Sequence, residues 1–221
     1  MLIKTKFSID AKICTLKYNA QKNGGIIFEG NVKLVVPSNQ RYFSWEERHT
    51  KDFITNIFTC FWGIDKVSKQ TPLFIGAIQL SVKNIDNERF IIDGEQRLTI
   101  LLLLFKVLKT KYPNLDALKE IHLDWLRIKV NKSFLKKALS FKGLHKKTYN
   151  SYLQHAFIIE DIIDSETKVE AGQPQLFDIN RFVTYLLSNM YFVVIETPLG
   201  FTRNLQTYEK KFTNSYLGFW R

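Results

Sequence analysis

The sequence FIIDGEQRLT at residues 90–99 marks the point where a short strand gives way to a helix. Residues 89–92 are typical of a strand, and Gly94 permits the tight turn that follows Asp93. From residue 96 to residue 111 the apolar side chains cover most of the helix circumference, which predicts a helix buried at the centre of the fold. The polar residues of the turn should therefore lie at the rim of the core.

The residues before this junction predict two further strands and another helix. Residues 31–36 alternate in polarity as in a strand. After Trp45 the apolar residues recur every three or four positions, which predicts an amphipathic helix. Residues 74–82 are typical of a strand, and the polar residues 83–88 would join it, as a hairpin, to the strand that precedes the turn.

The second half of the chain is mainly helical in pattern from residue 114 to residue 190. Good apolar stripes predict helices at residues 152–163 and 179–190. Residues 165–175 are polar and contain Gly and Pro, which indicates a loop. Residues 190–196, MYFVVIE, are rich in β-branched and aromatic residues and predict a buried strand.

This order of elements indicates the α+β class, with a small mixed sheet around the buried helix and a mainly helical region after it. We expect a core at residues 1–112 and a helical region at residues 113–221. Because the strand at residues 190–196 returns to the sheet, we expect the two parts to pack as one unit.

Composition narrows the classes of function. The chain has 221 residues, 45% of them hydrophobic, and a formal net charge of +11, which favours a polyanionic partner such as nucleic acid or a nucleotide. Two cysteines and four scattered histidines indicate neither a disulfide framework nor a structural metal site. The longest apolar run is too short to cross a bilayer and the first residues do not resemble a signal peptide. We therefore expect a cytoplasmic protein without a membrane partner.

The turn after the strand carries the groups that suit phosphate chemistry. Asp93 could hold Mg2+ or orient a water molecule, and Gly94 lets a ligand approach the backbone closely. Arg97 offers a planar pair of donors to a phosphate, and Gln96 can both donate and accept hydrogen bonds. The structural alternative is that the turn only caps the helix, with Arg97 paired to Glu95 or Asp93.

A second polar cluster, PSNQRYFSW, follows the earlier strand at residues 37–45. Gln40 and Arg41 would lie in a loop directly after that strand, either at a site or simply in solvent. Tyr42 and Trp45 could stack on a base or pack on the core, and we expect core packing for at least one of them.

These segments match a family in order and spacing. VPSNQRYFSW at residues 36–45, FIGAIQL at 74–80 and IIDGEQRLTILLLL at 91–104 resemble the N-terminal domain of GmrSD-type restriction endonucleases, which looks related to the ParB and sulfiredoxin-like fold. The resemblance is firm over residues 31–109 and looser up to the strand at 190–196. No Walker-type phosphate loop occurs in the chain, so a nucleotide site would be of another kind.

The resemblance implies a domain that binds and hydrolyses a nucleoside triphosphate with Mg2+, coupled to a nuclease domain or subunit that restricts modified foreign DNA. The family's QR loop falls on Gln40 and Arg41, which would bind the nucleotide or its phosphates. Its second signature falls on the turn. There the resemblance implies a metal-binding and catalytic Asp93, a phosphate-binding Gly94, a catalytic Gln96 and an Arg97 with both roles.

Two features depart from the family pattern. Glu95 stands where Gln is commoner, and its carboxylate would repel phosphates unless Mg2+ or Arg screens it. Residues 200–221 do not align with the helices that usually follow, and no HNH nuclease signature appears. The possible explanations are a fragment, a naturally short chain or an altered end, and we expect no nuclease activity from this chain alone.

A second hypothesis is a non-catalytic DNA-binding or adaptor module that uses the same phosphate pocket. It rests on the net charge and on a stretch from residue 129 to residue 159 that contains no acidic residue. Clustered lysines favour contact with a DNA backbone, although a solvated helical face is the alternative. The candidate lysines are Lys132, Lys136, Lys137, Lys142, Lys146 and Lys147.

Overall fold

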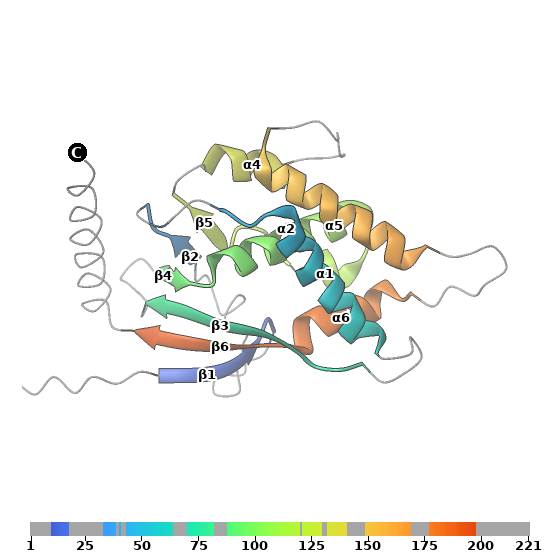
Figure 1. The fold of residues 1–221 in the computed structure, drawn as a ribbon, viewed down its shortest axis with the longest axis horizontal. Helices are drawn as coiled ribbons and strands as arrows, with labels where there is room; N and C mark the ends of the chain where they lie inside the picture. Colours follow the sequence, from blue (N-terminus) through green and yellow to red (C-terminus); the bar gives the residue numbers. More distant parts are fainter. Residues whose placement is uncertain are drawn as a thin grey trace, which may run out of the picture.

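The fold is taken from a computed structural model that describes residues 10–17, 33–38, 40, 43–63, 70–81, 88–119, 121–129, 132–140, 149–168 and 177–197. It confirms the expected α+β class, because a mixed sheet is combined with helices (Figure 1). The strands are β1 (Asp10–Thr15), β2 (Lys33–Val36), β3 (Leu73–Ser81), β4 (Glu88–Asp93), β5 (Leu126–Ile128) and β6 (Met190–Thr197). The helices are α1 (Glu47–Trp62), α2 (Glu95–Lys111), α3 (Asp116–Lys119), α4 (Lys132–Ser140), α5 (Ser151–Thr167) and α6 (Ile179–Ser188).

The strands form one sheet in the order β1-β6-β3-β4-β2-β5. β3 and β4 pair antiparallel, in agreement with the expected hairpin, whose connecting residues lie outside the described part. β6 runs parallel to β3 and antiparallel to β1, and β2 runs parallel to both β4 and β5. Strands from both halves of the chain therefore share one sheet.

Two strands were absent from the sequence-based expectation. β1 lies in an N-terminal stretch with no assigned element, and β5 lies in a stretch expected to be mainly helical. Both lie at the edges of the sheet, and β5 has only three residues, too few to show an alternating pattern.

The prediction of a loop from residue 165 was also wrong at its start, because α5 continues to Thr167. The indole of Trp62 donates a hydrogen bond to Glu166, and the hydroxyl of Thr167 donates to the Ile163 carbonyl one turn back. The last turn of α5 is polar, and these two hydrogen bonds, one to α1 and one within α5, stabilise it as helix.

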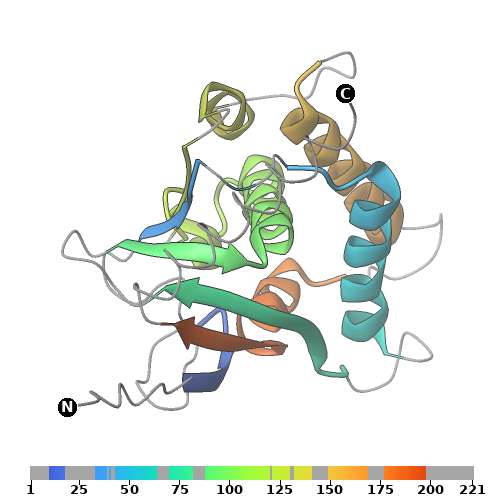
Figure 2. The ribbon, with the colours of Figure 1, turned by 60° about the vertical axis from the view of Figure 1, so that its left-hand side comes forward.

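The described helices gather on one side of the sheet, and α2 lies in the middle of them (Figure 2). α5 packs against both α1 and α2. The buried side chains of α2 point in every direction around the helix axis, and those of residues 98 and 100–105 are fully enclosed. The sequence-based prediction of a central buried helix is therefore confirmed.

An aromatic cluster closes the core between α1 and α6. Phe58 stacks on Phe182 with ring centroids 4.6 Å apart, and Phe61 meets Phe182 edge to face at 5.0 Å. Phe177, just before α6, contacts the same rings. These contacts couple α6, and the β6 strand that follows it, to the first half of the chain. None of the described helices is both long and apolar enough to cross a bilayer.

Leu103→Ala should lower the free energy of unfolding by about 2–5 kcal/mol, because Leu103 is fully buried in α2 and the cavity is enclosed on all sides. Ile13→Ala is the matched control: Ile13 is 63% exposed on an edge strand, and we expect a loss below about 1 kcal/mol. Urea denaturation monitored by circular dichroism measures both. Equal losses would contradict a central position for α2.

Candidate functional site

The two polar loops found in the sequence lie at the same edge of the sheet. β2 and β4 are parallel neighbours, so the loops that follow their carboxyl ends must emerge side by side. The contact is direct: Nε2 of Gln40 donates to the carbonyl oxygens of Ile91 (2.7 Å) and Ile92 (2.8 Å). Gln40 is thus joined to the last residues of β4, directly before Asp93. Arg41 lies outside the described residues.

Gln96 ties the first turn of α2 to the chain that follows the QR loop. Its side-chain oxygen accepts hydrogen bonds from the backbone N–H groups of Ser44 (2.9 Å) and Trp45 (3.2 Å). Gln96 is buried, so these bonds form away from water, where an unmet amide is costly. The segment of residues 43–45 is consequently held in place from the start of α2.

Arg97 is engaged by the backbone of β3. Its two terminal nitrogens donate to the carbonyl oxygens of Ile75 (2.6 Å) and Ala77 (2.7 Å). Between them Gly76 has φ +96°, and a Cβ there would lie 1.9 Å from Nη1 of Arg97. The register of β3 against β6 also shifts between Phe74 and Ala77. Arg97 therefore occupies space that is open only because residue 76, at the irregular part of β3, is glycine.

The alternative that Arg97 pairs with a nearby carboxylate is met in part, by Asp93. Nη2 of Arg97 lies 3.9 Å from Oδ2 of Asp93. The Asp93 side chain is 71% exposed, so this ion pair is weak and leaves most of the carboxylate in water. Asp93 is accordingly the signature side chain best placed to take a ligand among those described.

Gly94 makes the turn between β4 and α2. It adopts φ +96° and ψ 2° as the residue before the helix, a left-handed conformation that favours glycine. A Cβ at this position would lie 3.0 Å from Cγ1 of Ile78, so β3 packs closely against the turn. The positive end of the helix dipole of α2 lies directly behind Asp93.

Glu95 is a buried carboxylate, only 6% exposed, in the first turn of α2. Burial, followed by the negative charge of Glu95, raises the pKa of Tyr152 to about 12. Glu95 therefore acts electrostatically on a side chain of α5. It places a carboxylate inside the fold, close to Tyr152.

A buried histidine on α5 supports the same segment from the other side. Nδ1 of His155 forms a 2.7 Å hydrogen bond with the hydroxyl of Thr50 on α1. Burial lowers the pKa of His155, although a hydrogen bond with the Trp45 backbone and the charge of Glu47 act in the opposite direction. The Phe43 ring contacts the imidazole edge to face, with centroids 4.8 Å apart.

Sequence reasoning assigned His155 no role. Its position on the apolar face of a predicted helix was visible, but no spacing relates it to Thr50, 105 residues away. Gln96 and His155 together hold residues 43–45 between α2 and α5. Trp45 also packs on Phe53, with centroids 5.6 Å apart, which confirms core packing for one of the two aromatic residues of that loop.

The lysines expected to meet DNA are only partly described. Lys132, Lys136 and Lys137 are exposed on α4. Lys142, Lys146 and Lys147 lie outside the described residues. The three described lysines are on the same short helix and take part in none of the ion pairs found in the described part of the chain, so they remain available to a partner.

Side chains that could bind a metal are sparse. Within the part of the chain that the structure describes, no group of three or more His, Cys, Asp or Glu side chains could hold a metal ion. Mg2+, however, commonly uses one or two carboxylates together with water and phosphate oxygens. A single exposed Asp93 fits that donor set.

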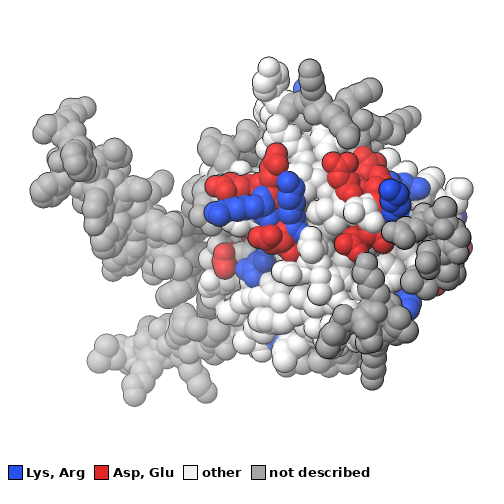
Figure 3. Space-filling view, turned by 45° about the vertical axis from the view of Figure 1, so that its right-hand side comes forward, with Lys and Arg blue, Asp and Glu red and all other residues white. Residues whose placement is uncertain are grey.

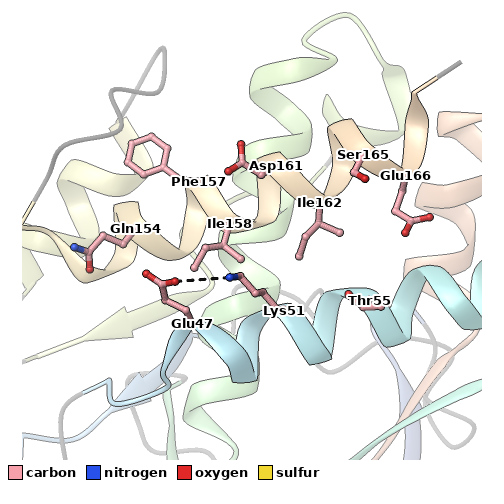
Figure 4. A pocket seen from close by; sticks show the side chains of 10 residues that line it. All are labelled: Glu47, Lys51, Thr55, Gln154, Phe157, Ile158, Asp161, Ile162, Ser165 and Glu166. Carbon is pink, nitrogen blue, oxygen red and sulfur yellow. Dashed lines mark ion pairs between the residues drawn. The ribbon is translucent and has the colours of Figure 1, made fainter. Parts of the chain in front are cut away.

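A hollow of about 600 Å³ lies elsewhere, between α1 and α5. Acidic side chains gather in clusters on the side of the molecule that Figure 3 brings forward. Glu47, Asp161 and Glu166 line the hollow with Lys51. In Figure 4 Glu47 and Lys51 extend from α1 toward α5, whereas the Asp161 carboxylate points from α5 away from α1. Three carboxylates against one ammonium group repel phosphate, so this hollow does not suit a nucleotide.

The geometry defines an α+β domain in which Gln40 and the DGEQR turn meet at one edge of a mixed sheet. Residues 19–213 match the family described as the GmrSD restriction endonuclease, N-terminal domain. Because the match covers most of the chain, the protein belongs to this family and is a component of a restriction system. No curated protein matches the chain.

Gly76→Ala should destabilise the fold by about 2 kcal/mol or more, because it forces alanine into a left-handed conformation and displaces Arg97 from its carbonyl partners. In an Arg97→Ala background the steric part disappears, so the same substitution should cost less. A double-mutant cycle of urea denaturation measures the difference. Strictly additive losses would show that Gly76 and Arg97 are not coupled.

Acidification should weaken the wild-type fold through His155. The unfolded chain protonates this imidazole below about pH 6.5. The buried imidazole takes up its proton only at lower pH, because its pKa is lowered. The free energy of unfolding should therefore fall as the pH drops from about 6.5 through the folded-state pKa.

The measurement is urea denaturation of wild type and His155→Gln between about pH 7 and about pH 5. The variant should lose less stability over this range than the wild type does. His122→Gln, at an exposed histidine, serves as the control and should keep the wild-type dependence. An unchanged pH dependence in His155→Gln would contradict the assignment.

Proposed function

We propose that this chain binds a nucleoside triphosphate with Mg2+ at the sheet edge between the QR loop and the DGEQR turn, and hydrolyses it. In this proposal, nucleotide turnover controls a nuclease domain or subunit that cuts modified foreign DNA. The observation that carries the proposal is the contact of Gln40 with the Ile91 and Ile92 carbonyls, which brings the two signature loops together. The family membership supports the restriction context.

Asp93 is the residue that we assign to the metal. Its carboxylate is largely exposed at the end of β4, where it would hold Mg2+ or orient the attacking water. When bound, Mg2+ would neutralise charge on the phosphate oxygens. Gly94 leaves room beside Asp93 for the phosphates to approach the backbone, and the N-terminal end of α2 adds a favourable field.

Arg41 is assigned to the phosphates by its place next to Gln40. Its guanidinium would supply charge-assisted hydrogen bonds of the kind that phosphate prefers. Arg97 has its two terminal nitrogens committed to β3 carbonyls, so we assign it a positioning role that fixes β3 against the turn. Cleavage of DNA is left to the nuclease partner.

Gln40 and Gln96 act as positioning residues in this proposal. Each one uses a side-chain amide to bind backbone groups of the opposite loop. Such bonds fix the loops before a ligand arrives, which reduces the entropy that binding must overcome. His155 and Thr50 extend this support to α1 and α5.

A thermal-melting screen of the chain with each of the four nucleoside triphosphates, with and without Mg2+, tests binding. At a concentration of about 100 times its Kd, a nucleotide should stabilise the fold by about 2.7 kcal/mol. Asp93→Asn should lose the Mg2+-dependent part of the shift. Asp52→Asn, at an exposed aspartate of α1, should respond as the wild type does.

Phosphate release by the same proteins then separates catalysis from binding. Turnover in the wild type and in Asp52→Asn, but not in Asp93→Asn, is the expected result. Stabilisation without phosphate release would leave the non-catalytic adaptor hypothesis in place. If no nucleotide shifts the melting temperature of the wild type, the nucleotide site is wrong.

A further inference from the structure

The hollow between α1 and α5 has an apolar floor and an acidic rim. Phe157, Ile158 and Ile162 of α5 provide the apolar surface, and Phe157 is nearly buried. Figure 4 shows Ile158 and Ile162 directed from α5 toward α1 across the gap. A ligand for this surface therefore needs an apolar group to cover the floor and positive charges for the rim.

The rim is acidic although the chain as a whole carries +11. α5 contains four carboxylates and no Lys or Arg in its 17 residues. Two of them, Glu160 and Asp164, pair with Lys111, and Glu166 accepts the Trp62 indole bond. Asp161 is exposed and takes part in none of the ion pairs of the described residues, so its charge is available at the rim.

The complementary chemistry is present on α4 of the same chain. Phe134 is 43% exposed there, although large apolar side chains are usually covered. Lys132, Lys136 and Lys137 are also exposed on this helix, which has no carboxylate. Lys137 lies three positions from Phe134 and therefore shares its face of the helix.

We propose that α4 of one copy docks in the α1–α5 hollow of a second copy. The exposed Phe134 ring covers the apolar floor, and Lys137 on the same face of α4 meets Asp161 and Glu166. Because Phe134 is exposed, it does not occupy the hollow of its own chain. The two surfaces differ, so the contact is heterologous: each copy can donate α4 to one neighbour and accept it from another.

The contact is small, so the association is weak and depends on concentration. Sedimentation velocity of the wild-type chain should show an average mass that rises with protein concentration at low salt. The mass should fall as salt is added, because the screening length shortens from about 10 Å at 0.1 M to about 3 Å at 1 M. A monomer at every concentration would overturn the proposal.

Charge reversal tests the pairing of the two surfaces. Asp161→Lys with Ser165→Lys reverses the hollow at two exposed positions one helical turn apart on α5. Lys136→Glu with Lys137→Glu reverses α4. Each double variant alone should remain monomeric, because like charges then face each other. A mixture of the two should associate again, since both possible contacts then join opposite charges.

The matched control is Asp52→Lys with Asn56→Lys, which makes the same charge change at exposed positions of α1 that do not line the hollow. It should associate as the wild type does, whereas Phe134→Ser should weaken association without changing the net charge. If the mixture of reversed variants stays monomeric, the pairing is wrong. If the α4 reversal abolishes binding to duplex DNA but leaves self-association unchanged, α4 is a nucleic-acid surface and the proposal fails.

Discussion

The burial of α2 on all sides dictates how the sheet and the other helices are arranged around it. A helix with apolar side chains around its whole circumference must be covered by the sheet on one side and by helices on the other. α5 and its neighbours provide that second layer. The first turn of α2 is nevertheless polar, so Glu95, Gln96 and Arg97 enter the edge of the core and need partners there.

Those partners are mostly backbone groups of distant segments, so most of the signature residues hold the fold together at the site and do not face a ligand. Gln40 binds the end of β4, Gln96 binds the segment after the QR loop, and Arg97 binds the irregular part of β3. A side chain with its polar atoms committed in this way shapes a site more than it contacts a ligand. The exposed Asp93 is left as the group that faces solvent at the same place.

The charges of the chain are unevenly arranged. The lysines of α4 and the carboxylates of α5 belong to consecutive helices, but the hollow is lined by residues of α1 and α5 and by none of α4. A net charge of +11 therefore coexists with an acidic hollow. Net charge therefore describes the long-range field, whereas a docking surface depends on which side chains share a face. Which partner the basic helix α4 binds therefore depends on the side chains that lie beside it in the folded protein.

Local sequence patterns were enough to predict individual elements: β4, the DG turn, the buried helix α2 and the hairpin partner β3 all follow from periodicity and turn chemistry within a few residues. The sequence also identified the family, because the QR and DGEQR segments are local patterns. The folded chain was needed to see that β2 runs beside β4, that Arg97 binds β3, and that His155 meets Thr50 from 105 residues away. Such pairings depend on how the buried faces of distant segments fit together, and no pattern within a single segment records that fit.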